Sequence, residues 1–284
     1  MKRRESRYVT VARIAYDLAK KTLPKYSHSK SKHRYTFQQL AACVLVMFYV
    51  NKSYRDMEEW LLASDRVLEV LELAEVPNYS TLQRTYKKLR MKDLEQMQRK
   101  LLEEAGPEEA EDSIAVDTTG FSPSQASLHY LTRSGRQYRA WVKGAYAVGT
   151  RSQYILAWGY GRGPSGDSPH LAPLRRMAAR YGRHQGRRRA WLLLADRGFE
   201  DHGLHPCDLV PVTHRVGQHP KPIRQARGEL VEQARLDGLF GQRWKVETVN
   251  SVIKRKFGSA IRSRCIRLQN REPIVKALVY NIHR

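Results

Sequence analysis

The sequence predicts an all-helical region over residues 1–112, followed by an α/β region over residues 113–284 in which helices flank a mixed sheet. In the first region hydrophobic residues recur every three or four positions, whereas in the second they gather in short runs of strand length. The charge changes at the same place, because residues 1–112 hold 21 basic and 17 acidic residues and residues 113–284 hold 30 and 11. An acid-rich stretch with a Gly-Pro break, residues 103–112, lies at the border and predicts a linker.

The net charge of +23 and the pI of about 10.1 indicate a polyanionic partner. Nucleic acid is the leading candidate and an anionic membrane the second. Three widely spaced cysteines argue against a disulfide framework. The longest apolar run, residues 40–50, is about half as long as a bilayer requires, and no signal peptide follows the amino terminus. We therefore expect a cytoplasmic protein that is associated with the nucleoid.

Three helices are expected in the first region, over residues 37–50, 54–73 and 80–102, with breaks at residues 51–53 and 76–78. Ser80 is positioned as the N-cap of the third helix. The first turns of this helix carry Arg84 and Lys87 and resemble the second helix of a helix-turn-helix motif, which predicts contact with DNA. A core helix with a solvated basic face explains the same residues equally well.

In the second region strands are expected over residues 113–116, 138–148, 154–159, 191–195 and 208–213. Helices are expected from Ser168-Pro169 to about Tyr181, over residues 239–256, and from about Pro273 onward. Strands that later alternate with helices are typical of a mixed α/β sheet, in which functional residues lie at the carboxyl ends of strands.

Two aspartates directly follow apolar strands. Asp117 comes after residues 113–116, and Asp196 comes after residues 191–195. A single aspartate in this position is more often a turn former than a catalytic residue. Two of them within a strongly basic region favour a shared site at one edge of the sheet.

A third carboxylate, Glu247, lies in the helix expected over residues 239–256. At about 100° per residue, Phe240, Arg243, Glu247 and Lys254 fall on one narrow face. A surface helix with an Arg-Glu pair accounts for Arg243 and Glu247 but does not account for Phe240 or Lys254. Three carboxylates among many cations suit two-metal phosphoryl chemistry, in which the acids hold Mg²⁺ or Mn²⁺. Basic residues beside the acids, such as Arg197, are then expected to hold the phosphodiester backbone.

Together these motifs resemble those of the DDE transposases of bacterial and archaeal insertion sequences. One large group carries the signature Tyr-x2-Arg-x3-Glu-x6-Lys, and this chain reads Phe240-x2-Arg243-x3-Glu247-x6-Lys254 with every spacing kept. The segments AVDTTGF and LLADRGF resemble the two aspartate motifs of that group. The resemblance therefore implies that Asp117, Asp196 and Glu247 form the acidic triad and that Arg243 and Lys254 contact phosphates. Phe240 keeps the aromatic ring of the signature tyrosine without its hydroxyl, so it is expected to contact DNA by stacking, or to pack, but not to donate a hydrogen bond to phosphate.

The resemblance also implies a ribonuclease H-like catalytic domain over about residues 113–284 that uses two Mg²⁺ or Mn²⁺ ions. It implies cleavage at the element ends by water, joining of the freed 3′ hydroxyls to target DNA, and a homodimer on DNA. Only 50 residues separate Asp196 from Glu247, which leaves little room for the β insertion of some relatives. Two other functions stay open: a metal-dependent nuclease of the same fold, and a truncated, non-catalytic DNA-binding repressor, with which a chain ending at Arg284 is compatible.

The second region also contains an arginine cluster and an aspartate in a Gly-rich turn. Seven arginines occur between residues 175 and 189 without an intervening acid: Arg175, Arg176, Arg180, Arg183, Arg187, Arg188 and Arg189. Because such a cluster repels itself, non-specific DNA contact is favoured over a solvated helix face. Asp167 lies in the Gly-rich turn GRGPSGDSPH, and since no P-loop Lys-Ser/Thr follows, a turn and cap role is expected for it.

Overall fold

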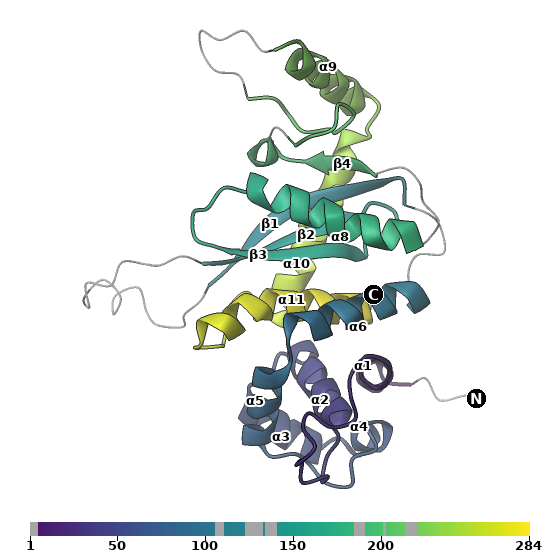
Figure 1. Ribbon diagram of the computed structural model, residues 1–284, viewed down its shortest axis with the longest axis vertical. Coiled ribbons are helices and arrows are strands. Elements are labelled where there is room, and N and C mark those ends of the chain that lie inside the picture. Colours follow the sequence, from purple (N-terminus) through teal and green to yellow (C-terminus); the bar gives the residue numbers. More distant parts are fainter. Residues whose placement is uncertain are drawn as a thin grey trace. The chain divides into compact units, whose positions relative to one another are not determined.

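The computed structural model describes residues 5–105, 111–122, 133, 141–184, 191–200, 203–213 and 221–284 (Figure 1). The chain forms two compact units. The first comprises Met1–Ala105, Lys256–Gly258 and Val275–Arg284, and the second comprises Gly106–Arg255 and Ser259–Ile274. The boundary predicted near residue 112 kept all later residues together, whereas here two short late segments group with the first unit.

Helices make up the first unit: α1 (Arg7–Thr22), α2 (Phe37–Tyr49), α3 (Tyr54–Leu62), α4 (Asp65–Val70), α5 (Tyr79–Lys88) and α6 (Met91–Ala105). Helix α1 was not among the helices expected from the sequence. The helices expected over residues 54–73 and 80–102 are each divided into two. Helix α2 is buried along almost its whole length, so it forms the centre of this unit.

The break predicted over residues 51–53 is present between α2 and α3. Asn51 has a φ of 54°, a left-handed conformation that ends the helical path. Ser53 then starts α3 through a capping box with Asp56, in which each side chain satisfies a backbone N–H of the other residue.

The N-cap predicted for the helix that carries Arg84 and Lys87 is wrong by two residues. Asn78 is the N-cap of α5, and its side chain accepts a hydrogen bond of 3.0 Å from the backbone N–H of Ser80. The Glu58 carboxylate accepts a further bond from the N–H of Tyr79. Because these two groups satisfy the first free donors of the helix, α5 begins at Tyr79.

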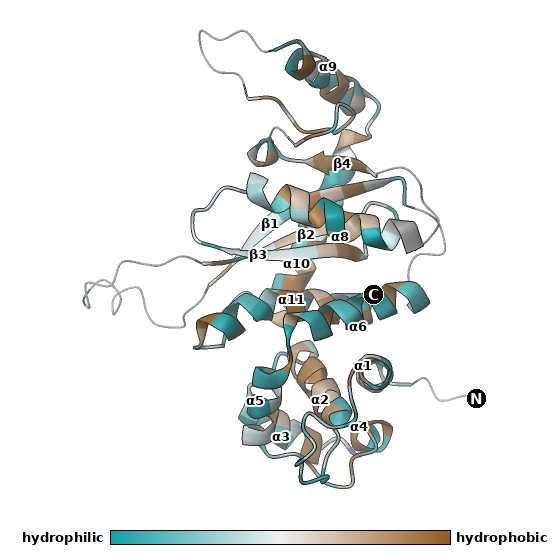
Figure 2. Ribbon diagram, viewed as in Figure 1, coloured by the Kyte–Doolittle hydropathy of each residue, from teal (hydrophilic) through white to brown (hydrophobic). Residues whose placement is uncertain are grey.

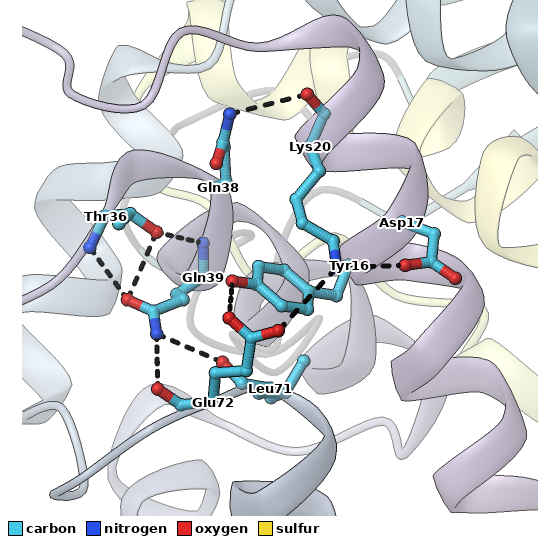
Figure 3. A network of polar contacts seen from close by, with 8 residues as sticks. All are labelled: Tyr16, Asp17, Lys20, Thr36, Gln38, Gln39, Leu71 and Glu72. Carbon is cyan, nitrogen blue, oxygen red and sulfur yellow. Dashed lines mark hydrogen bonds and ion pairs between the residues drawn. The ribbon is translucent and has the colours of Figure 1, made fainter.

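A network of polar contacts joins α1, α2 and the turn that follows α4 (Figure 3). Gln39 forms a capping box with Thr36 at the start of α2. The Gln39 amide also donates to the backbone carbonyls of Leu71 and Glu72, at 3.2 Å and 2.6 Å. The carboxylate of Glu72 in turn accepts a bond of 2.9 Å from the Tyr16 hydroxyl. One glutamine thus links the cap of its own helix to a turn about 30 residues away.

The second unit contains a four-stranded sheet in the order β3-β2-β1-β4, which confirms the expected mixed α/β architecture. The strands are β1 (Ser113–Phe121), β2 (Val142–Gly149), β3 (Ile155–Arg162) and β4 (Leu192–Ala195). β1 pairs antiparallel with β2 and parallel with β4. Figure 2 shows hydrophobic residues along β4, as expected for a strand that is buried on both faces. In place of the strand expected over residues 208–213, the described residues form an isolated bridge between Leu194 and Leu209.

Helices cover both faces of this sheet. On one face α8 (Leu171–His184), which follows the 3₁₀ turn η1 (Ser168–His170), packs on β2 and β3 (Figure 1). The other face contacts α10 (Trp244–Phe257), whose Asn250 bonds to Asp117 of β1, and α11 (Ile266–His283), whose Pro273 carbonyl accepts a bond from the Tyr146 hydroxyl of β2. Helix α11 begins seven residues before the proline at which a helix start was expected.

Side chains alternate between these two faces along each strand. Asp117 and its register partner Tyr146 lie on the face of α10 and α11. Thr118 and Lys143 lie on the opposite face, where both contact Asp167.

Candidate active site

The first predicted aspartate, Asp117, does not follow its strand as expected, because β1 continues to Phe121; Asp117 lies in the middle of β1 and is half-buried. One of its carboxylate oxygens accepts a hydrogen bond of 2.8 Å from the side-chain amide of Asn250, on α10. Burial raises the pKa of Asp117 to about 6, and the negative charge of Asp196 adds to the increase. A half-buried carboxylate beside a second carboxylate is therefore the electrostatic centre of this site.

The second predicted aspartate, Asp196, directly follows β4. It is the N-cap of the 3₁₀ turn η2 (Arg197–Phe199), and its Oδ1 accepts a bond of 3.0 Å from the backbone N–H of Gly198. In the parallel ladder of β1 and β4, Val116 is paired with Ala195. Asp117 and Asp196 are thus the next residues on two neighbouring strands, whose backbones are about 4.8 Å apart. The sheet brings these two aspartates together.

The third predicted carboxylate, Glu247, lies in the first turn of α10. Its side chain is half exposed and forms an ion pair of 2.5 Å with Arg243. Asn250, which touches Asp117, follows three residues later on the same helix, about 4.5 Å along the helix axis. Glu247 therefore lies about one helical turn from Asn250, the residue of α10 that contacts Asp117. The Glu247 carboxylate itself is paired with Arg243.

The helix expected over residues 239–256 is interrupted at its start. Phe240–Arg243 form the 3₁₀ turn η3, and α10 begins only at Trp244. The common face predicted for the signature residues assumed one continuous α-helix, so it does not extend to Phe240. The Phe240 ring instead packs against Leu194, Leu209 and two residues of α9 (Pro222–Leu236), with the Arg235 guanidinium 5.4 Å from the ring centroid. Lys254, on α10, is partly exposed.

The arginines of α8 have different surroundings. Arg175 is mostly buried and forms an ion pair with Asp208, whose side chain is fully buried. Arg176 and Arg180 are exposed, as is Arg197 beside Asp196. The side chain of Arg183 and the whole of Arg187, Arg188 and Arg189 lie outside the described residues.

In the first unit, Arg84 and Lys87 lie on the exposed side of α5. The buried residues of the same helix are Leu82, Thr85 and Tyr86. α5 thus has both the core face and the basic face that the two interpretations of its sequence required.

Two groups of residues at the site were not found from the sequence. Asn250 was missed, although its position three residues after Glu247 places it near the same helix face. Asp167 and Lys143 were also missed as a pair, and no local pattern connects residues on two different elements.

The donor set suits a divalent cation. Carboxylate oxygens are the ligands that Mg²⁺ and Mn²⁺ prefer, and a cation would offset the repulsion between Asp117 and Asp196. Within the described residues, no three potential ligand side chains gather closely enough to hold a metal ion. Because the Glu247 carboxylate is paired with Arg243, Asp117 and Asp196 are the two predicted ligands that lie next to each other.

Carboxylates on adjacent strands, within a basic α/β unit, suit the two-metal chemistry by which nucleases and polymerases act on phosphodiesters. A family model described as the transposase DDE domain matches residues 109–282. The chain therefore belongs to the transposase DDE domain family, whose substrate is DNA and whose members generally use divalent metal ions. No curated protein matches the chain. In the part of the chain that the structure describes, no helix has the length and apolar character needed to cross a membrane.

Proposed function

We propose that this chain is the transposase of an insertion sequence, of the group with the Tyr-x2-Arg-x3-Glu-x6-Lys signature. It cleaves DNA at the element ends and joins the freed 3′ hydroxyls to a target. The observation that carries this proposal is the register of β1 and β4, which sets Asp117 and Asp196 side by side, with α10 held against Asp117 through Asn250.

In this proposal Asp117, Asp196 and Glu247 hold two Mg²⁺ or Mn²⁺ ions. Such ions activate the attacking oxygen and stabilise the leaving 3′ oxygen. The protein's own part is to place the three carboxylates and to bind the DNA backbone. When Glu247 turns to the aspartates, its ion pair with Arg243 is released, and the Arg243 guanidinium becomes available to a phosphate.

The DNA contacts of the second unit follow from exposure. Arg197 and Lys254 flank the carboxylates along the chain, and the exposed Arg176 adds a positive charge on α8, on the other face of the sheet. Arg175, held by Asp208, supports α8 from within. Phe240 supports η3 by packing, because its partly buried ring lies against an apolar cluster and beside Arg235.

We also propose that the second unit is a ribonuclease H-like domain. Its central strand β1 with an antiparallel neighbour and a parallel neighbour, and its helices on both faces, support this assignment. The helical region over residues 1–112 is proposed to recognise the element ends through Arg84 and Lys87 of α5. Because two ends must be processed together, the proposed active form is a homodimer on DNA, at the nucleoid.

The test is a cleavage and strand-transfer assay on a duplex that carries the DNA flanking this gene, with Mg²⁺ or Mn²⁺. Asp117→Ala, Asp196→Ala and Glu247→Ala are each expected to abolish strand cleavage while DNA binding is retained. Glu232→Ala is the matched control, because Glu232 is also an exposed helix glutamate paired with an arginine, Arg235, at 2.5 Å. It is expected to cleave like the unchanged chain.

Each outcome of this assay separates one alternative. Metal-dependent nicking at the element boundary, followed by joining to target DNA, supports a transposase. Nicking without joined products, even from a pre-cleaved end, identifies a nuclease of the same fold. Tight binding without a cut under either metal identifies a non-catalytic DNA-binding protein.

A further inference from the structure

Asp167 does not act as the helix cap that its sequence context predicts. It occupies the N-cap position of η1, yet within the described residues its side chain makes no capping hydrogen bond there. Its Oδ1 instead accepts a bond of 2.8 Å from the Thr118 hydroxyl and one of 2.6 Å from the Lys143 ammonium group. Asp167 therefore joins the loop before α8 to the two central strands of the sheet.

Lys143 is a buried lysine, with 8% of the residue exposed. Besides Asp167, its ammonium group contacts the backbone carbonyl of Ser165. A buried ammonium group is costly unless it is paired and hydrogen-bonded. The pair also neutralises Asp167, so that this carboxylate adds little net negative charge near the two aspartates of the site.

The contacts of Asp167 reach the residues beside both of those aspartates. Thr118 directly follows Asp117 and points to the opposite face of β1, so a bond to Thr118 restrains the backbone beneath Asp117. Gly198, which donates its N–H to Asp196, lies against the other side of Asp167. A Cβ added to Gly198 would lie 3.2 Å from Asp167 Oδ2 and 3.1 Å from Asp196 Oδ1.

We propose that Asp167 is a positioning residue that sets the separation of Asp117 and Asp196 by holding Thr118 with one carboxylate oxygen and abutting Gly198 with the other. This inference rests on the proposed function, because the separation matters when the two aspartates bind a cation together. Groups that orient metal ligands from behind commonly change metal affinity or activity by about 10- to 100-fold when they are removed.

The cleanest probe is the Thr118 hydroxyl. Asp167→Ala would leave Lys143 buried without its partner, and loss of folding would hide the effect on the site. Thr118→Val removes the hydroxyl at nearly constant shape, and Thr118→Ser restores it. Thr150→Val is the matched control, because it removes the hydroxyl of a buried threonine that directly follows β2 and contacts Ser113 at the far end of β1.

Mn²⁺ affinity, measured by electron paramagnetic resonance on the full chain, is the main readout, with the thermal unfolding midpoint and the rate of DNA nicking recorded alongside. Thr118→Val is expected to weaken Mn²⁺ binding by about tenfold or more, and Thr118→Ser is expected to recover it. Thr150→Val is expected to lower the unfolding midpoint without changing Mn²⁺ affinity. Gly198→Ala, which pushes a methyl group between the two carboxylates, is expected to weaken Mn²⁺ binding as Thr118→Val does.

Two results overturn the inference in different ways. If the unchanged chain binds Mn²⁺ and nicks DNA while Thr118→Val binds Mn²⁺ equally well, Asp167 has only a structural role and the proposed function stands. If the unchanged chain neither binds Mn²⁺ nor nicks DNA, the proposed function fails and the positioning role fails with it.

Discussion

The side-chain amide of Asn250 donates a hydrogen bond of 2.8 Å to the carboxylate of Asp117, across 133 residues of sequence. This contact ties α10 to the central strand β1. It also determines which turn of α10 faces the aspartates, since Glu247 lies one turn before Asn250.

Replacing Asn250 with alanine is expected to slow strand cleavage by about tenfold or more and to lower the free energy of unfolding by about 1–2 kcal/mol. The reason is that Asp117 loses its hydrogen-bond donor and α10 loses its registration on β1. Asn270→Ala is the control, because Asn270 also joins a helix to the sheet through its side chain, by a bond of 3.0 Å from Arg162. Equal loss of cleavage in both variants would contradict a specific role for Asn250.

The raised pKa of Asp117 makes the metal-free protein less stable at neutral pH. Its pKa is about 6 in the folded chain against an ordinary value of 3.8, so the folded state holds the proton more tightly than the unfolded state. The resulting stability is present below about pH 4 and is lost as the pH rises through 6, a cost of about 3 kcal/mol at pH 7.5.

Asp117→Asn is therefore expected to raise the free energy of unfolding at pH 7.5, and the gain is expected to shrink as the pH falls toward 4. Urea denaturation in the presence of a chelator, at several pH values, measures this difference. A variant that is less stable than the unchanged chain at pH 7.5 would show that burial of the Asp117 charge is not costly.

Arg175 and Arg176 are neighbours with different roles. Arg175→Gln leaves the fully buried Asp208 without its ion-pair partner and is expected to lower the free energy of unfolding by about 3 kcal/mol or more. Arg176→Gln, at an exposed position, is expected to change it by less than about 0.5 kcal/mol. Chemical denaturation of the two variants decides between a structural and a surface role.

The same exposed position is expected to affect DNA binding. Replacing Arg176 and Arg180 together should reduce the slope of log affinity against log salt concentration by about one unit for each phosphate that the variant no longer neutralises. Filter binding of a duplex at several salt concentrations measures the slope. An unchanged slope would show that α8 is not part of the DNA-binding surface.

The residue that caps the N-terminus of helix α5 can be tested by substitution. Asn78→Ala is expected to lower the free energy of unfolding by about 1 kcal/mol, because Asn78 caps the helix. Ser80→Ala is expected to change it little, since Ser80 takes part through its backbone N–H. If Ser80→Ala lowered the free energy of unfolding more than Asn78→Ala does, Ser80 would be the N-cap, as the sequence predicted.

The local features of the fold were accessible from sequence because each depends on neighbouring residues. The break before Ser53, the change to strand period at Ser113 and the aspartate after the apolar strand β4 are short-range patterns, whereas the continuation of β1 past Asp117 was not predicted. The interruption at Phe240 was not accessible, because an ideal helix period cannot show where a 3₁₀ turn precedes an α-helix. The burial of Arg175 was not accessible either, because its partner Asp208 lies 33 residues away on another element.

By itself the sequence determined the family, through three motifs in order and the spacing from Phe240 to Lys254. The tertiary structure alone decided that Asp117 and Asp196 share a register, that Asn250 reaches Asp117, and that Asp167 lies behind both aspartates. The physical reason is that a spacing along the chain reports only local geometry. Which distant side chains meet depends on strand order and helix packing, because buried polar groups must find partners wherever the fold places them.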